Sequence, residues 1–189
     1  MFGDAALLIV TAADEPPVDR HALRLDIGER TGRWAAQLDA ALIDLAGPAI
    51  IVAAELAAIA FAHWAQLSPL RYSRQITGAV LLDPAGPGEW ARLGLASTPA
   101  TPLPFPSLLV ASGIGTAAHI GELATRWHSR FVTSDAVRNS RAVDAIEAPL
   151  LAALRAYLTL RIPTAPTLRR SIAELTSPLA SILAALHHR

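Results

Sequence analysis

The feature that most constrains this chain is the apolar run Ala49–Ala54, which passes without any turn sequence into a helical pattern beginning at Glu55. The run contains three β-branched residues and is apolar on both faces, as in a central strand of a parallel sheet. The apolar residues that follow recur with a period of about 3.6, which predicts a helix: Leu56, Ile59, Ala60 and Trp64. Because parallel strands are joined by helical crossovers, the chain is expected to adopt an α/β fold.

The same alternation of apolar runs and helical patterns continues along the chain. Strands are predicted at Ala5–Thr11, His21–Ile27, Ile76–Asp83, Ser107–Ser112 and Arg130–Ser134. Further helices are predicted at Thr31–Leu45, Thr116–Ser129 and Val143–Leu160. These elements predict a three-layer sandwich, with a mostly parallel sheet between two layers of helices.

The composition excludes several kinds of chemistry. The chain has no Cys, so disulfides, thiolate nucleophiles and Cys-ligated metal sites are excluded. All 16 basic residues are Arg, and without Lys neither a Schiff-base enzyme nor a Walker-type phosphate loop can form. The formal net charge is zero, which removes the broad positive field of nucleic-acid-binding proteins. Nucleic acid is therefore not expected as a partner.

The sequence favours a cytoplasmic protein. Met1–Asp4 carries an acidic residue where a signal peptide needs positive charge, and the apolar run behind it is short. Hydropathy approaches that of a membrane span over Ala46–Leu67, but Pro48, Glu55 and His63 oppose insertion into hydrocarbon. We therefore expect no membrane span.

The turn within Val52–Ala57 resembles the nucleophile elbow of α/β-hydrolases. In that fold a strained strand-to-helix turn holds the nucleophile, with small residues two positions before and after it. Ala53 and Ala57 occupy the small positions, and Glu55 stands where those enzymes have Ser. The elbow residue of such enzymes has a positive φ, which costs on the order of 1–2 kcal/mol for a non-Gly residue.

Three further stretches share this resemblance: Gly32–Ala41, Ala62–Ala65 and Leu103–Ser112, the last of which reads Leu-Pro-Phe-Pro-Ser-Leu-Leu-Val-Ala-Ser. Together with the elbow they make residues 5–160 similar to the small serine hydrolases of the retinoblastoma-binding-protein and YdeN type. The resemblance implies an α/β-hydrolase fold with a Ser-Asp-His triad and an oxyanion hole.

The catalytic positions that this resemblance implies hold other residues here. Glu55 replaces the family's Ser, and Ala54 replaces the His that usually precedes it. Gly115 falls where the family's Asp follows the Leu-Pro-Phe-Pro strand, and Arg138 falls near the family's His. The first loop is shortened to Thr11–Glu15. The sequence therefore predicts a pseudoenzyme, a hydrolase fold that acts by binding or assembly.

Two interpretations of Glu55 remain open. A carboxylate in the first turn of a helix is favoured by the helix dipole by about 0.3–1 kcal/mol, which would be a structural role. In the other interpretation, Glu55 and Arg138 form an ion pair where Ser and His hydrogen-bond in the family.

The excursion Pro84–Ala100 is expected to cap the remnant of the catalytic cleft. The residues expected around that cleft are Thr11, Ala54, Leu56, Ser112 and Trp90.

Enzymatic activity also stays open. An active esterase-type hydrolase would need displaced catalytic groups, for which the nearby polar candidates are Ser112, His119, Asp135 and Glu55. His119 and Glu122 have a metal-binding spacing but lack a third ligand, so neither a metal nor another cofactor is expected. The expected partner is an unknown small ligand or a protein.

The last residues predict a helical extension, 163–189, behind a domain of residues 1–162. Its apolar residues have heptad spacing: Leu168, Ile172, Leu175, Leu179, Ile182 and Leu186. This seam packs either on the chain's own domain or against a second copy, which would make the chain a dimerising interaction protein. The seam is shorter than the several heptads of a coiled coil, which favours packing on the domain.

Overall fold

The computed structural model describes residues 5–14, 22–27, 33–45, 47–68, 73–97, 100–133 and 148–161. The strands are β1 (Ala6–Ala12), β2 (Leu23–Leu25), β3 (Ala49–Ala54), β4 (Ile76–Leu82), β5 (Ser107–Ala111) and β6 (Arg130–Thr133). The helices are α1 (Arg33–Ile43), α2 (Glu55–Leu67), α4 (Pro87–Trp90), the 3₁₀ helix η1 (Ala91–Leu93), α5 (Ile114–Trp127) and α7 (Ala148–Arg161). Each predicted strand and helix of the domain is confirmed, with shifts at the ends.

The six strands form one sheet in the order β2-β1-β3-β4-β5-β6, and every neighbouring pair is parallel. β3 lies inside the sheet, and all of its residues are buried, as its two-sided apolar sequence predicts. Because all strands run in the same direction, their carboxyl ends lie at one edge, where the loops that follow them meet.

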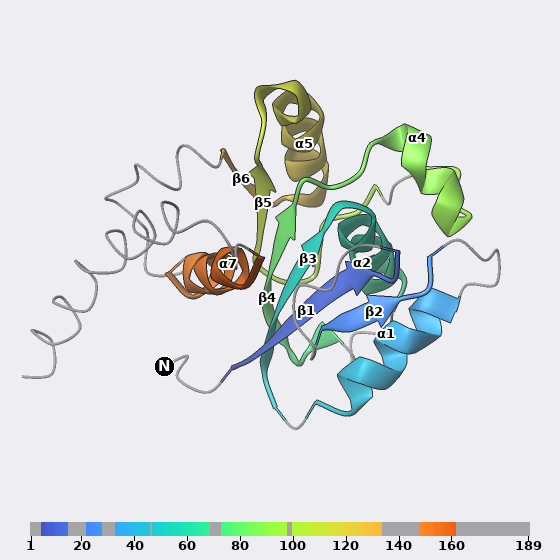
Figure 1. Cartoon of the computed structure of the whole chain (residues 1–189), viewed down its shortest axis with the longest axis vertical. Helices are drawn as coiled ribbons and strands as arrows, with labels where there is room; N and C mark the ends of the chain where they lie inside the picture. Colours follow the sequence, from blue (N-terminus) through green and yellow to red (C-terminus); the bar gives the residue numbers. More distant parts are fainter. Residues whose placement is uncertain are drawn as a thin grey trace, which may run out of the picture.

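Helices cover both faces of the sheet (Figure 1), so the predicted three-layer α/β sandwich is confirmed. On one face α1, α2 and α5 bury their apolar side chains in a common core with β1, β3, β4 and β5. On the other face α7 packs Leu150, Leu154 and Tyr157 over alternate residues of the same strands. Gly78 on β4 permits this approach, because a Cβ there would lie 2.6 Å from Cδ2 of Leu150.

The described part of the apolar stretch Ala46–Leu67 divides between strand β3 and helix α2, so it is not a single helix. A membrane-crossing helix needs about 20 predominantly apolar residues, and α2 is only 13 residues long. Within the described ranges, no helix combines the length and hydropathy that a membrane span requires.

Several predicted boundaries differ from the observed ones. β2 keeps only three residues of the expected His21–Ile27, and α7 is described from Ala148 onward, since residues 134–147 lie outside the described part. β4 ends at Leu82, because Asp83 has φ 40° and leaves the extended conformation. The expected extension, residues 163–189, lies outside the described residues.

Candidate functional site at the strand-to-helix elbow

The chain turns from β3 into α2 without an intervening residue. Ala54 is still extended, with φ −123° and ψ 154°, whereas Glu55 has φ 49° and is already the first residue of α2. Ala53 and Ala57 are fully buried, so their small side chains let the strand and the helix pass closely. The turn therefore has the positive φ and the two small flanking residues expected of an elbow.

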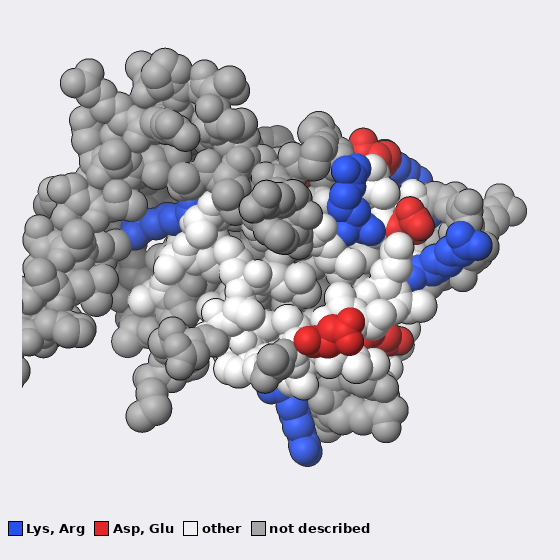
Figure 2. All heavy atoms as spheres, turned by 60° about the horizontal axis from the view of Figure 1, so that its bottom comes forward, with Lys and Arg blue, Asp and Glu red and all other residues white. Residues whose placement is uncertain are grey.

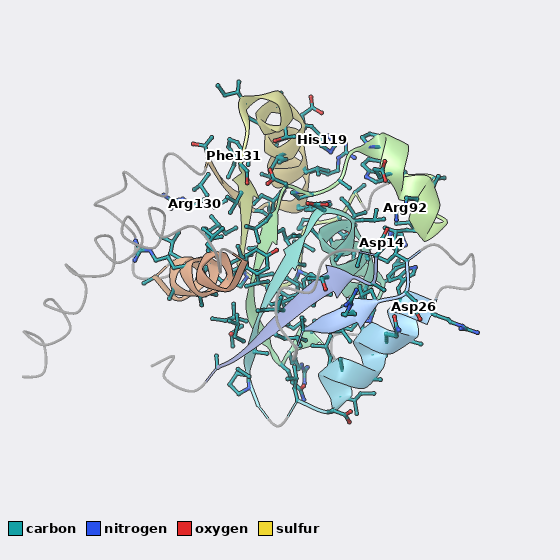
Figure 3. All side chains as sticks on the ribbon, in the orientation of Figure 1. Asp14, Asp26, Arg92, His119, Arg130 and Phe131 are labelled. Carbon is teal, nitrogen blue, oxygen red and sulfur yellow. The ribbon has the colours of Figure 1, made fainter. Side chains whose placement is uncertain are left out.

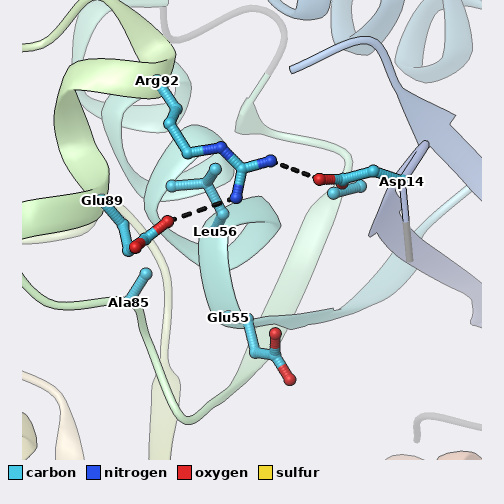
Figure 4. Close-up of a pocket in the computed structure, with 7 residues that line it drawn as sticks. Asp14, Glu55, Leu56, Ala85, Glu89 and Arg92 are labelled. Carbon is cyan, nitrogen blue, oxygen red and sulfur yellow. Dashed lines mark hydrogen bonds and ion pairs between the residues drawn. The ribbon is translucent and has the colours of Figure 1, made fainter. Parts of the chain in front are cut away.

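Glu55 presents an exposed side chain at the carboxyl edge of the sheet. It lies in the first turn of α2, where the helix dipole favours a negative charge. Its backbone carbonyl accepts a 3.1 Å hydrogen bond from the amide of Ala85, which fixes the elbow to the segment after β4. In Figure 4 the carboxylate of Glu55 points away from the guanidinium of Arg92.

A second acidic residue with positive φ follows the neighbouring strand. Ala54 pairs with Leu82 in the sheet, so Glu55 and Asp83 occupy equivalent positions one residue beyond the paired ends of β3 and β4. Oδ1 of Asp83 accepts a 2.8 Å hydrogen bond from the backbone amide of Ser112. Asp83 thus connects the ends of β4 and β5. In the sequence Asp83 was predicted only as the end of a strand, although its position before Pro84 marked a break.

A pocket of about 280 Å³ opens beside the elbow (Figure 4). Its polar side chains are three carboxylates and one guanidinium, and its apolar lining comes from Ala12, Leu56 and Ala85. The guanidinium of Arg92 donates to Asp14 and, at 3.2 Å, to Glu89. The hydrogen bond to Asp14, which has the larger effect, and the hydrogen bond to Glu89 raise the pKa of the Arg92 guanidinium above its ordinary value.

Sequence reasoning missed Asp14, Glu89 and Arg92 as site residues. Arg92 and Asp14 are 78 residues apart, and only the fold brings them together (Figure 3). The Arg92–Glu89 pair has the i, i+3 spacing of a helical ion pair, which was the one available signal.

The segment that contributes Arg92 was expected to act as a cap, and it lies next to the pocket. Trp90 of this segment is buried, and its indole N–H donates a 2.8 Å hydrogen bond to the carbonyl of Ala85. The ring of Trp90 also lies 6.3 Å from that of His119 on α5. Trp90 therefore anchors the segment and does not line this pocket.

The other residues expected around the cleft are dispersed. Leu56 lines the pocket, but Thr11 is fully buried, two positions after Ile9, whose side chain packs with Ala54 on the α7 face of the sheet. Ser112 is exposed at the end of β5. Of the residues expected around the cleft, only Leu56 lines the pocket together with Glu55.

The remaining catalytic equivalents are only partly described. Gly115 is exposed in the first turn of α5, with open space around its Cα. Arg138 lies outside the described residues, and so does the expected Glu55–Arg138 ion pair. Asp135, a candidate for a displaced triad, also lies outside them.

The two half-buried histidines of the described chain pack against aromatic rings. Nε2 of His119 is buried with no hydrogen-bond partner among the described residues, and the same holds for Nδ1 of His63. His63 lies edge-on to Trp34, at 6.1 Å between ring centroids, and its burial lowers its pKa. In the part of the chain that the structure describes, no three His, Asp or Glu side chains are grouped as metal ligands.

The surface charge is mixed. On the described part of the face in Figure 2, acidic and basic side chains are interspersed and separated by uncharged surface. This distribution agrees with the zero net charge of the sequence.

Comparison with known proteins places these features in a family. A comparison with curated proteins gives no significant match. The crystal structure of a YdeN-like hydrolase from Pectobacterium atrosepticum is similar at 22% identity with a TM-score of 0.49, over 68% of this chain and 77% of that one. The family model described as serine hydrolase matches residues 18–138, which include the elbow, the cap segment and β5. With most of its sequence matched by this model, the chain belongs to the serine hydrolase family.

Proposed function

We propose that this chain is a noncatalytic member of the serine hydrolase family that acts by binding a small ligand or a protein partner. One observation carries the proposal: a carboxylate, that of Glu55, stands at the elbow in place of a hydroxyl. A serine nucleophile needs a base within hydrogen-bond reach, and a carboxylate at the same place has no hydroxyl proton to give to such a base.

Two histidines of the described chain support this proposal. The buried ring nitrogens of His63 and His119 have no hydrogen-bond partner among the described residues, so neither nitrogen activates a serine there. Ser112, the serine at the carboxyl edge of β5, bonds through its backbone amide to Asp83.

The pocket supports a binding role. Its volume, about 280 Å³, lies just below the range for small-molecule sites, about 300–1,000 Å³. Its charged side chains could orient a small polar ligand over the apolar lining from Ala12, Leu56 and Ala85. The same proposal includes a cytoplasmic location, which rests on the sequence alone.

A fluorophosphonate probe tests the proposal, because it reacts covalently with activated serines. We expect no heat-sensitive labelling of the full chain under conditions that label an active serine hydrolase completely. The Glu55→Ser variant should also remain unlabelled, since it restores the hydroxyl without the rest of the triad.

Heat-sensitive labelling of the unaltered chain would overturn the proposal. The Ser112→Ala variant would then show whether the displaced esterase is real, because loss of labelling would identify Ser112 as its nucleophile. Serine variants distant from the pocket, such as Ser68→Ala, serve as matched controls.

A further inference from the structure

The pocket beside the elbow is bounded by two segments that are far apart in the sequence. Asp14 follows β1, and its turn is fixed because the amide of Ala13 donates a 2.9 Å hydrogen bond to the carbonyl of Leu25. Arg92 lies in η1, behind the anchored Trp90. Both side chains line the pocket, together with Glu55 and Leu56 from the elbow between them.

The guanidinium of Arg92 joins these two segments. One terminal nitrogen of the guanidinium donates to Asp14 across the pocket, and the other donates to Glu89 within its own segment (Figure 4). All three side chains are about half exposed, with 44% for Arg92, 53% for Asp14 and 55% for Glu89. Ion pairs this exposed are weak and are screened by salt.

The backbone around Arg92 is held much more firmly than its side chain. Trp90 and Leu93 are buried on either side of it, and the amide of Leu95 bonds to the carbonyl of Trp90 at 3.1 Å. Release of the Arg92–Asp14 contact would therefore free a long side chain at the pocket without unfolding the segment.

We propose that Arg92 is a salt-sensitive latch at the pocket beside Glu55: its contact with Asp14 holds two walls of the pocket together, and the loss of that contact widens the pocket. The Arg92–Glu89 pair keeps the guanidinium oriented within its own segment and does not close the pocket. The role of the latch in ligand entry rests on the proposed binding function. The latch itself depends only on the contacts of Arg92 with Asp14 and Glu89.

The absence of Cys from the chain allows a direct test by single-cysteine labelling. Ala12→Cys places a thiol in the pocket, at a position that is 1% exposed while Arg92 contacts Asp14. Ala79→Cys places one in the core of β4, where only unfolding of the domain exposes it. The measured quantity is the rate of reaction of each full-length variant with N-ethylmaleimide, a neutral reagent, at low and high salt.

We expect Arg92→Gln and Asp14→Asn each to accelerate labelling at position 12 by about 2- to 5-fold at low salt, as for the loss of one exposed ion pair. High salt should raise the labelling rate of the Ala12→Cys variant to a similar value. It should leave the labelling rate unchanged in the Ala12→Cys variant that also carries Arg92→Gln. Glu122→Gln is the matched control, because it removes an exposed carboxylate on α5 that does not line the pocket. Its labelling rate should stay close to that of Ala12→Cys alone.

Equal labelling rates at position 12 in all backgrounds would overturn the latch. Parallel acceleration at positions 12 and 79 would also overturn it, because the substitutions would then act through unfolding. Neither result bears on the fluorophosphonate experiment, so failure of the latch and failure of the proposed function are distinguishable.

Discussion

The indole nitrogen of Trp64 donates a 2.8 Å hydrogen bond to Oδ1 of Asp39, and this bond ties α2 to α1. Trp64 is 3% exposed, and Asp39 is half-buried. Because α2 begins at the elbow, this contact helps to fix the helix that presents Glu55.

Substitution of Asp39 should therefore destabilise the domain. Asp39→Ala leaves the buried indole N–H without its charged acceptor, and we expect the free energy of unfolding to fall by about 1.5–3 kcal/mol. Asp39→Asn keeps an acceptor and should lose less. Urea unfolding measures both, with Asp44→Asn, an exposed carboxylate one turn later, as the control; equal midpoints for Asp39→Ala and Asp44→Asn would contradict the prediction.

The positive φ of Glu55 predicts an unusual order of stabilities. Glycine tolerates this conformation and alanine does not, so Glu55→Gly should be more stable than Glu55→Ala by about 0.5–1 kcal/mol, after glycine's entropy cost is subtracted. At the exposed, helical position 40 the order should reverse, and Ala40→Gly should lose about 1 kcal/mol. Thermal or urea unfolding of the three variants decides; if Glu55→Gly proves less stable than Glu55→Ala, the turn relaxes in solution.

The half-buried ring of His63 predicts a pH dependence of stability. Burial lowers its pKa below 6.5 in the folded state, so between the two pKa values the unfolded chain binds more protons. The free energy of unfolding should therefore decrease as the pH falls from about 6.5 through the folded-state pKa, and then level off.

The variant His63→Phe keeps the aromatic contact with Trp34 and removes the titrating group. Urea unfolding between pH 5 and 8 should give a flatter pH profile for this variant than for the unaltered chain. Parallel profiles would assign the pH dependence to other groups.

Gly78 should be intolerant of a methyl group. In Gly78→Ala the new Cβ would lie 2.6 Å from Cδ2 of Leu150 and 3.2 Å from the carbonyl oxygen of Pro106, so the Leu150 side chain or α7 must shift; we expect a loss of about 1–3 kcal/mol. Leu150→Ala removes the clashing side chain, so the double variant should be more stable than the sum of the single losses predicts. Gly86→Ala, with open space around it, should change stability little. Strict additivity at positions 78 and 150 would refute the clash.

The heptad seam predicted in the last residues is a separate proposal. If the seam packs on the domain, as its short length favours, Leu175→Glu combined with Leu179→Glu should lower the free energy of unfolding and leave the molar mass unchanged. Static light scattering of the full chain gives the mass. A mass halved by the two substitutions would show instead that the seam joins two copies.

The strand-to-helix pattern was largely readable from the sequence because its signals are local. The apolar run of β3 and the period of α2 each depend on a few consecutive residues, and they meet at Glu55 whatever the rest of the chain does. The ends of elements were less predictable. Asp83, for example, leaves β4 with a positive φ, and its carboxylate accepts a hydrogen bond from the amide of Ser112, the residue after β5.

The sequence by itself determined an α/β chain whose elbow carries Glu55 between Ala53 and Ala57. Only the tertiary structure decided what surrounds that elbow: Asp83 joined to Ser112, 29 residues away, and Arg92 joined to Asp14, 78 residues away. The physical reason is that local patterns set the conformation of a segment, whereas strand order and register set which distant side chains share an edge of the sheet. A contact between exposed charges leaves no periodic trace in the sequence, because neither partner has to be apolar or to recur.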